Sequence, residues 1–394
     1  SAVRSGLCYS TPHKAQTFRT LLIWTAAATL PLWLSIGSCP DRSKRMQPRN
    51  PDMLVHLLKT KWTGKKYAMN YAQTKSRNTF TKFTGRICIV MALLTAQSAL
   101  AEPAGKESMI RNAKQILFLG DSITMDGRYV AAVDAWLTAR YGANARVAVN
   151  AGLSSETVSG LTEEGHADGK FPRPYLHERL GRVLDYVKPD LVFACYGMNC
   201  GIYKPFDEER FKKYREGITL LHDAATKAGA RIVFITPAMY DNKQTQNGDA
   251  SYDEVLARYS AWLLSQRATG WNVIDVHGPM VEEVAKQRQA AAPNFTFAPD
   301  GVHPDDAGHW FMAKQIIAYF EDADAANATS PELIPEIKPG TLALVKRRLD
   351  VRRDATLSVT EHTHPSFPKG PPMDEAQATI AELDRQIAAL YSTR

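Results

Sequence analysis

Four short segments of the sequence carry residue types that could perform acyl transfer together. They are Gly-Asp-Ser at 120–122, Asn-Ala-Gly at 150–152, Tyr-Gly-Met-Asn at 196–199 and Asp-Gly-Val-His-Pro at 300–304. A serine hydroxyl becomes a nucleophile when a base takes its proton. His303 is the candidate base, because Asp300 stands three residues before it and could hold the imidazole in one tautomer. Ser122, His303 and Asp300 therefore predict covalent catalysis on an ester.

Each of these residues also has a structural interpretation. Serine is a favoured N-cap, so Ser122 could simply begin a helix, and Asp300 could cap a helix that starts at Pro304. Asn199 could be an ordinary turn residue, and Gly152 could be a steric necessity without any part in the chemistry. The catalytic interpretation is favoured because all four segments occur at predicted strand ends or in loops that face the same site.

The same segments resemble the four sequence blocks of the GDSL or SGNH hydrolase superfamily, over about residues 113–320. The Ser, Gly, Asn and His of those blocks correspond to Ser122, Gly152, Asn199 and His303. The first block reads GDSIT instead of GDSL, and this exchange of Ile for Leu does not touch the chemistry. The resemblance implies a serine esterase whose triad includes Asp300. It also implies an oxyanion hole made by the backbone N–H groups of Ser122 and Gly152 and the side-chain amide of Asn199.

Five short apolar runs alternate with longer helical patterns after residue 112. The runs are 115–120, 146–150, 190–195, 231–236 and 272–276, and the helical patterns are 130–141, 175–187, 207–228, 252–269, 279–289 and 304–320. Near-continuous apolar runs are typical of parallel strands that are covered on both faces. We therefore expect a doubly wound, flavodoxin-like α/β fold, with three α/β/α layers and a five-stranded parallel sheet. Ligands bind beyond the carboxyl ends of the strands in such sheets, which is where the four segments lie.

The loops expected to form the rim of the site are polar. They span 154–174, 201–206 and 237–250, and we predict the substrate rim at Asp121, Glu156, Arg173, Tyr203 and Tyr240. A long-chain lipase should present large apolar loops there. The loops instead favour short, acetyl-type esters of a carbohydrate or another polar alcohol, that is, a small-molecule or polysaccharide ester as substrate. A lysophospholipase-like or thioesterase-like hydrolase and a catalytically silent glycan-binding module on the same fold are the alternatives.

No cofactor or metal is expected, because the sequence contains no metal-ligand cluster and no phosphate-binding glycine loop. A solvated pair is the favoured interpretation of His362 and His364. Of the five cysteines, only Cys195 and Cys200 lie beyond residue 101, and whether they pair stays open.

The net charge of +7 is the sum of two unlike parts. Residues 1–101 contain 15 Lys and Arg against two acidic residues, whereas the remainder contains 33 basic and 39 acidic residues. No interleaving of aromatic and basic residues accompanies the basic part, so we expect no nucleic-acid partner.

The basic part carries two apolar stretches that could direct export. The stretch 87–96 follows basic residues and precedes Ala-Leu-Ala at 99–101, which predicts a signal peptide over 69–101 and an exported, periplasmic or extracellular protein. Residues 1–68 would then be a non-native or disordered upstream segment. The rival interpretation is a membrane anchor over 20–40, which ends in a lipoprotein-like Ile-Gly-Ser-Cys. This anchor would be the chain's one contact with a membrane.

The predicted hydrolase domain covers 102–324, and a C-terminal extension covers 325–394. Proline-rich and basic sequence over 325–373 predicts an extended wrap with one strand at 341–345. An amphipathic helix is expected over 374–391, with a stripe formed by Ile380, Leu383, Ile387 and Leu390. Packing of this stripe on the hydrolase domain is favoured over packing on a partner. A scaffold that is attached to the cell envelope through the basic clusters is a further alternative, and the oligomeric state stays open.

Overall fold

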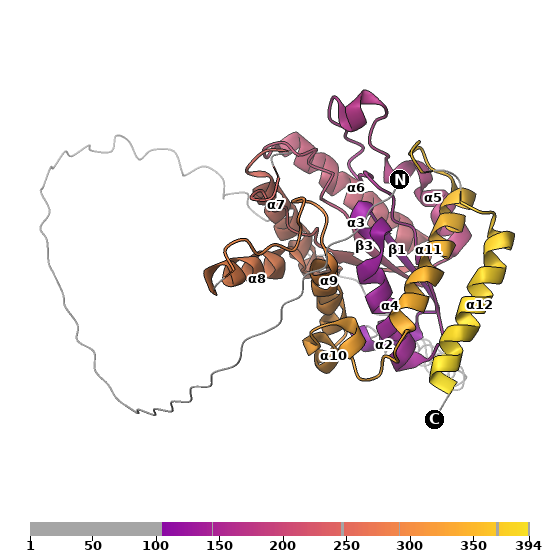
Figure 1. Ribbon diagram of the computed structural model, residues 1–394. Coiled ribbons are helices and arrows are strands. Elements are labelled where there is room, and N and C mark those ends of the chain that lie inside the picture. The colour runs from indigo at the N-terminus through magenta and orange to yellow at the C-terminus, as the bar shows by residue number, and fades with distance from the viewer. Residues whose placement is uncertain (1–104, 144, 246–247, 291, 368–369, 393–394) are drawn as a thin grey trace, which may run out of the picture. The chain divides into compact units, whose positions relative to one another are not determined.

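The computed structural model describes residues 105–143, 145–245, 248–290, 292–367 and 370–392 (Figure 1). All of these residues belong to one unit, Thr79–Arg394. The predicted signal peptide over 69–101 and the alternative anchor over 20–40 lie outside the described residues. Within the described residues, no helix combines the length and the apolar character that a membrane span requires.

The predicted parallel sheet is present, with each strand at its predicted place. Its strands are β1 (Gln115–Gly120), β2 (Val147–Asn150), β3 (Leu191–Cys195), β4 (Arg231–Ile235) and β5 (Asn272–Ile274). They are all parallel, in the order β2-β1-β3-β4-β5. Strand β2 thus lies on one side of β1 and β3 lies on the other, so the direction in which strands are added reverses at β1. Ligands bind at such a reversal point in open α/β sheets, so the loops after β1, β2 and β3 are the place to look.

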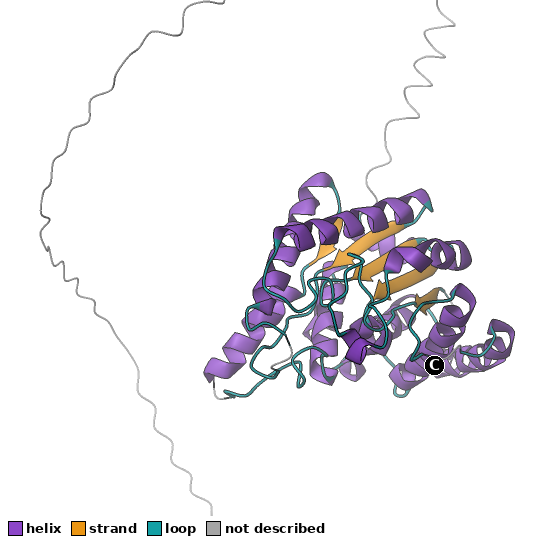
Figure 2. Ribbon diagram, turned by 90° about the horizontal axis from the view of Figure 1, so that it is seen from above, coloured by secondary structure: helices purple, strands orange, loops and turns teal. Residues whose placement is uncertain are grey.

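Helices cover both faces of this sheet, which makes the expected three-layer α/β/α fold (Figure 2). The α-helices before the C-terminal extension are α2 (Lys106–Asn112), α3 (Ser122–Asp126), α4 (Arg128–Tyr141), α5 (Leu176–Val187), α6 (Glu208–Lys227), α7 (Tyr252–Ser265), α8 (His277–Ala290), α9 (Asp306–Tyr319) and α10 (Ala323–Asn327). Three short 3-10 helices are η1 (His166–Gly169), η2 (Gln266–Thr269) and η3 (Pro331–Leu333). The core is formed by the buried residues of β1, β3 and β4 and the inner faces of the helices.

The C-terminal extension differs from the sequence prediction. Residues 341–345, predicted as a strand inside an extended wrap, form the first part of the long helix α11 (Thr341–Thr360). The prediction was wrong because the Leu-Ala-Leu-Val run fits a buried strand as well as a helix, and tertiary packing decides between them. The buried positions of α11 include Val345, Leu349 and Arg352, a helical spacing that points one face inward.

The predicted terminal helix is confirmed as α12 (Met373–Ser392). Its stripe residues Ile380, Leu383 and Ile387 are buried. Helix α12 packs along α11, which in turn packs against α4 and β2, and the two long helices lie side by side in Figure 1. The stripe therefore packs within the chain's own α/β unit, as was favoured from the sequence.

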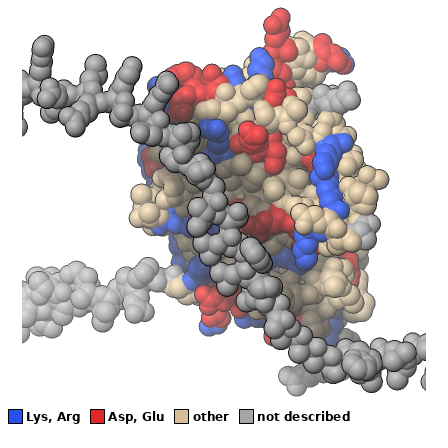
Figure 3. All heavy atoms as spheres, turned by 90° about the vertical axis from the view of Figure 1, so that its left-hand side faces the viewer, with Lys and Arg blue, Asp and Glu red and all other residues tan. Residues whose placement is uncertain are grey.

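Acidic and basic side chains are interspersed on the face shown in Figure 3. On this face of the described residues, neither sign of charge forms a continuous patch.

Candidate active site

Ser122, His303 and Asp300 form a hydrogen-bonded line of three side chains. The Ser122 Oγ lies 2.9 Å from the His303 Nε2, and the His303 Nδ1 lies 2.7 Å from the Asp300 Oδ2. Because a carboxylate only accepts hydrogen bonds, the Nδ1 carries the proton and the Nε2 is left to accept from the serine hydroxyl. This is the arrangement in which histidine can act as a general base toward serine.

Asp300 is held in place as an acceptor. Its Oδ1 accepts the backbone N–H groups of Val302 at 2.8 Å and His303 at 2.7 Å. Partial burial raises the pKa of Asp300, but the hydrogen bonds from His303 and Val302 outweigh it, so the pKa is lower than usual. Asp300 therefore stays ionised and can stabilise a positive charge on His303.

Ser122 stands at the junction between β1 and α3. Asp121 caps the helix, since its Oδ1 accepts the Ile123 N–H at 3.0 Å. The preceding Gly120 has no room for a side chain, because an added Cβ would lie 2.8 Å from the backbone oxygen of Cys195. Asp121 does not lie on the rim as predicted: its side chain is buried, and burial raises its pKa to about 6. It braces the turn that presents the serine.

Gly152 lies beside this turn, but its N–H is already engaged. It donates to the Asn150 Oδ1 at 2.9 Å, and an added Cβ would lie 2.5 Å from the Met125 backbone nitrogen. The steric interpretation thus accounts for the glycine, and the structure does not offer its N–H as a free donor. Three residues later, Ser155 has a φ of 62°, and its N–H has no partner among the described residues. Sequence reasoning missed Ser155, because a serine gives no signal of a left-handed conformation.

Asn199 is brought into the same region by the loop after β3. Its Oδ1 accepts the Tyr203 hydroxyl at 3.1 Å, and its Nδ2 makes a long 3.4 Å contact with the Glu156 carbonyl oxygen. The Glu156 carbonyl oxygen can only accept, so the amide atom that faces it is the nitrogen and the amide oxygen faces Tyr203. The amide N–H₂ therefore remains the part of Asn199 that can serve a ligand, and Tyr203 orients it.

Residues 118–311 match the GDSL-like lipase/acylhydrolase family. These residues form a domain of that family. The matched range contains all five residues singled out from the four sequence blocks. No curated protein matches the sequence.

Two solved structures resemble this acylhydrolase at low identity. One is a gut microbial diltiazem-metabolizing enzyme, with 21% identity and a TM-score of 0.43, covering 54% of this chain and 47% of that one. This chain thus spans about half of the length of that enzyme. The other is Axe2, an acetylxylan esterase from Geobacillus stearothermophilus, with 24% identity and a TM-score of 0.40, covering 52% of this chain and 94% of that one. Neither likeness identifies the substrate of this acylhydrolase.

Glu156 is not a rim residue of the acylhydrolase. Its side chain is fully buried and pairs with the buried Arg179, with an Nε–Oε1 distance of 2.6 Å. The Tyr196 hydroxyl donates to the Glu156 Oε2 at 2.7 Å, and the Arg179 Nη2 donates to the Ala151 carbonyl oxygen at 2.7 Å. The prediction was wrong because Arg179 lies on α5, and nothing in the local sequence shows that it neutralises Glu156. This network instead supports the loops that carry Gly152 and Asn199.

Arg173 and Tyr240, which were also predicted at the rim, both pack against Tyr203. The Arg173 guanidinium forms a two-pronged ion pair with Glu163, at 2.7 and 2.6 Å, and lies 5.3 Å from the centre of the Tyr203 ring. Tyr240 is buried, and its ring packs edge-on against Tyr203. Arg173 and Tyr203 are partly buried, so these residues form a packed wall behind Asn199.

A cavity of ≈ 360 Å³ opens beside the nucleophile. It is lined by Ser122, Ile123, Met125, Asp126, Ser154, His303, His309, Arg353 and Phe367. The last two belong to the C-terminal extension and were not predicted, because nothing in a proline-rich stretch shows what it packs against. The structure also places His309, which is buried, in this wall. Burial lowers its pKa to about 4, so it is neutral near pH 7.

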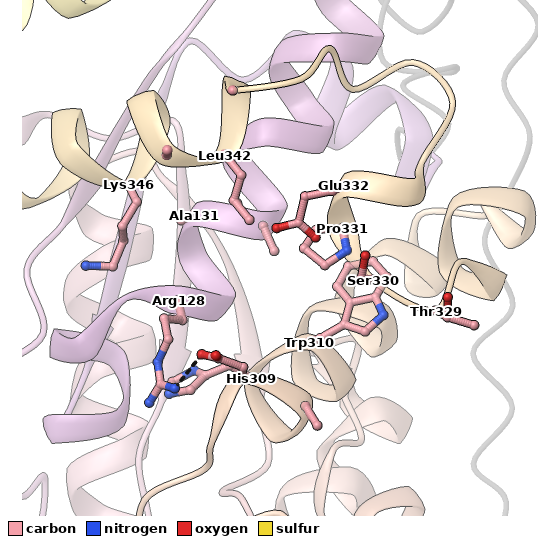
Figure 4. A pocket seen from close by; sticks show the side chains of 15 residues that line it. Arg128, Ala131, His309, Trp310, Thr329, Ser330, Pro331, Glu332, Leu342 and Lys346 are labelled. Carbon is pink, nitrogen blue, oxygen red and sulfur yellow. Dashed lines mark hydrogen bonds and ion pairs between the residues drawn. The ribbon is translucent and has the colours of Figure 1, made fainter. Parts of the chain in front are cut away.

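A larger cavity of ≈ 630 Å³ lies between α4, α9, the η3 segment and α11 (Figure 4). It shares His309 with the smaller cavity, but neither Ser122 nor His303 lines it. The ion pair between Arg128 and Asp306 stands at its edge. The smaller cavity, which Ser122 and His303 line, is therefore the candidate substrate cavity.

The cysteines and the histidine pair do not add a second reactive centre. Cys195 and Cys200 are free and buried, and burial raises the pKa of the Cys200 thiol to about 12. His364 is buried rather than solvated, which corrects that part of the prediction. Among the described residues, no group of three or more His, Cys, Asp or Glu could hold a metal ion.

Proposed function

We propose that this acylhydrolase is a serine esterase for short-chain, acetyl-type esters of a carbohydrate or another polar alcohol. The observation that carries the proposal is the line from Ser122 through His303 to Asp300, with contacts of 2.9 and 2.7 Å. A silent binding module would gain nothing from a serine that is hydrogen-bonded to a histidine with its own carboxylate.

The reaction runs in two halves. His303 takes the Ser122 proton while the Oγ attacks the ester carbonyl carbon, and the carbonyl oxygen becomes an oxyanion. As the tetrahedral adduct collapses, His303 gives the proton to the leaving alcohol oxygen, and an acyl-serine remains. Water, deprotonated by His303, then attacks the acyl carbon and forms a second tetrahedral adduct. As this adduct collapses, the bond to the Ser122 Oγ breaks, His303 returns the proton to the Oγ, and the acid is released. Asp300 stabilises the imidazolium in both halves. General base catalysis of the kind proposed for His303 contributes about 10²–10⁴-fold to the rate.

The oxyanion needs donors that are in place before it forms. The Ser122 N–H at the start of α3 and the Asn199 amide held by Tyr203 are the two donors that the geometry favours. The Gly152 N–H would serve only if it left the Asn150 Oδ1. The Ser155 N–H is the better third candidate, since it has no partner among the described residues.

The preference for a small, polar ester rests on the size and lining of the cavity beside Ser122. At ≈ 360 Å³ it lies at the small end of the usual range for ligand pockets, which is about 300–1,000 Å³. Its lining includes Asp126, His303 and Arg353 beside apolar side chains, so it is not the continuous apolar channel that a long-chain ester requires. Export through the predicted signal peptide at 69–101 is part of the proposal, because an exported esterase would meet polysaccharide esters.

The test compares p-nitrophenyl acetate, butyrate and octanoate, and acetylated xylan, with the wild type, Ser122→Ala and Ser265→Ala. Ser265 is exposed at the end of α7 and does not line the cavity, so it is the control for removing a hydroxyl. We expect Ser122→Ala to lose at least about 10³-fold in kcat, Ser265→Ala to stay near the wild type, and acetate to be preferred. Equal rates for Ser122→Ala and the wild type would refute the enzyme mechanism, and a rate that rises with acyl length would refute the acetyl specificity.

A further inference from the structure

The nucleophile cavity is closed in part by the C-terminal extension. Arg353 of α11 and Phe367 of the following loop line it together with Ser122 and His303. The Arg353 Nη1 donates to the Met125 carbonyl oxygen at 2.7 Å, which ties α11 to the end of the helix that begins with the nucleophile. The extension is therefore part of the wall around the reacting bond.

Helix α11 is fixed on the hydrolase unit by buried contacts. The Arg352 Nη1 donates to the Ala148 carbonyl oxygen on β2 at 2.9 Å, and the Arg182 Nε on α5 donates to the Thr360 carbonyl oxygen at 2.6 Å. These bonds hold both the middle and the end of α11. The loop that leaves α11 thus starts from a defined position.

Aromatic contacts then position Phe367 at the cavity. The His364 ring centre lies 4.5 Å from that of Phe171 and 4.6 Å from that of Phe367. The Ser366 N–H donates to the His364 Nδ1 at 3.2 Å, so this nitrogen carries no proton. Phe171 and Phe367 flank the same buried histidine, but only Phe367 reaches the cavity.

Under the proposed mechanism, this cavity lies on the leaving-group side of Ser122. His303, which must deliver a proton to the leaving oxygen, lines the cavity, whereas Asn199, the side-chain donor of the proposed oxyanion hole, does not. The alcohol portion of the ester therefore occupies this space, and Phe367 faces it.

The charges in this cavity are compensated. Asp126 is paired with Arg128, and Arg353 is paired with both Asp350 and Asp354. His309 is neutral because burial lowers its pKa to about 4. An anionic alcohol such as a uronic acid would find no free positive charge here, whereas a neutral ring that has an apolar C–H face would fit against Phe367.

We propose that Phe367 determines which alcohol the esterase accepts, by packing against the apolar face of a neutral sugar ring that carries the acetyl group. This inference rests on the proposed function, because it assigns the alcohol side of the same site. The C-terminal extension then supplies the residue that separates sugar acetates from acetates of very small alcohols.

The test uses the full chain and the variants Phe367→Ala and Phe171→Ala. Acetate release is followed with methyl acetate, whose alcohol is too small to reach the ring, and with a neutral acetylated xylo-oligosaccharide. Phe171→Ala is the matched control, because it removes the other ring that packs on His364. We expect Phe367→Ala to raise KM for the oligosaccharide by about tenfold, with kcat/KM for methyl acetate within twofold and Phe171→Ala near the wild type.

Three results would overturn the inference. They are an equal loss on both substrates, an equal loss in Phe171→Ala, and a changed ratio of p-nitrophenyl butyrate to acetate instead of a changed alcohol preference. Urea unfolding of each variant shows whether the fold is intact. Failure of the proposed function itself would look different, because the wild type would then hydrolyse no ester faster than Ser122→Ala.

Discussion

Replacing Arg348 by methionine should be among the most destabilising single changes in the C-terminal extension. The Arg348 Nη2 lies 2.8 Å from the Asp134 Oδ2 on α4, and the two side chains are 3% and 1% exposed. Its Nη1 lies 2.7 Å from the Asp384 Oδ1 on α12. One guanidinium thus joins α11 to both of its neighbours, and its removal leaves the Asp134 carboxylate buried without its partner.

Breaking a buried pair by removing one partner costs about 3–5 kcal/mol. The free energy of unfolding of a typical protein is about 5–15 kcal/mol, so the loss is a large part of the total. For a domain of this size, 1 kcal/mol changes the Tm by about 2–4 °C. We therefore expect Arg348→Met to lower the Tm by about 10 °C and to move the urea midpoint to a lower concentration.

Two further variants make the result interpretable. Arg385→Met removes the Arg385–Glu382 pair on α12, whose side chains are 71% and 50% exposed, and should cost less than about 1 kcal/mol. The double change of Arg348→Met with Asp134→Leu removes both buried charges and should recover most of the stability. Urea unfolding followed by circular dichroism measures all three. If Arg348→Met costs no more than Arg385→Met, the ion pair does not hold the extension on the hydrolase unit.

Three further outcomes follow from the site. Asp300→Asn should reduce kcat by about 10³–10⁴-fold through the wrong His303 tautomer, with the Tm nearly unchanged because the Asp300 side chain is 58% exposed; a large fall in Tm would contradict this. Tyr203→Phe should lower kcat about tenfold with little change in KM, because the Asn199 amide loses its orientation; a change in KM alone would point to substrate binding. Burial raises the pKa of Asp121 from 3.8 to about 6, so between these values the folded state holds a proton that the unfolded chain has lost. The wild type should therefore lose up to about 3 kcal/mol relative to Asp121→Asn as the pH rises through that window; urea unfolding of both proteins at pH 4 and pH 7 measures this, and a constant difference would refute it.

The sheet and the hydrogen-bonded line of Ser122, His303 and Asp300 could be predicted because their signals are local. Each of the five strands is one short, continuous apolar segment of the sequence. Asp300 and His303 are likewise close in sequence, three residues apart. The spatial meeting of Ser122 with His303 could be inferred because parallel strands bring their carboxyl ends to one edge.

The rim could not be predicted in the same way, because it depends on partners that are distant in sequence. Glu156 is charged and follows a turn, which favours exposure, but Arg179 neutralises it 23 residues later on another element. The burial of Asp121 could not be predicted from the local sequence either, because its place in the loop is set by the turn into α3. Local composition gives the average burial of a residue type, whereas the actual burial depends on which countercharge the fold brings to it.

The arginines of α11 show why the extension belongs to the enzyme rather than to a tether. Arg348, Arg352 and Arg353 bond respectively to Asp134 on α4, to the Ala148 carbonyl oxygen on β2 and to the Met125 carbonyl oxygen on α3. A solvated basic cluster could leave the domain without consequence, but these guanidinium groups satisfy acceptors on the elements around the nucleophile. A chain that ended near residue 330 would leave the Asp134 charge without its partner and uncover the inner face of α4. Such a chain is expected to lose its fold and its hydrolysis together, which would exclude a role for the extension as an attachment alone.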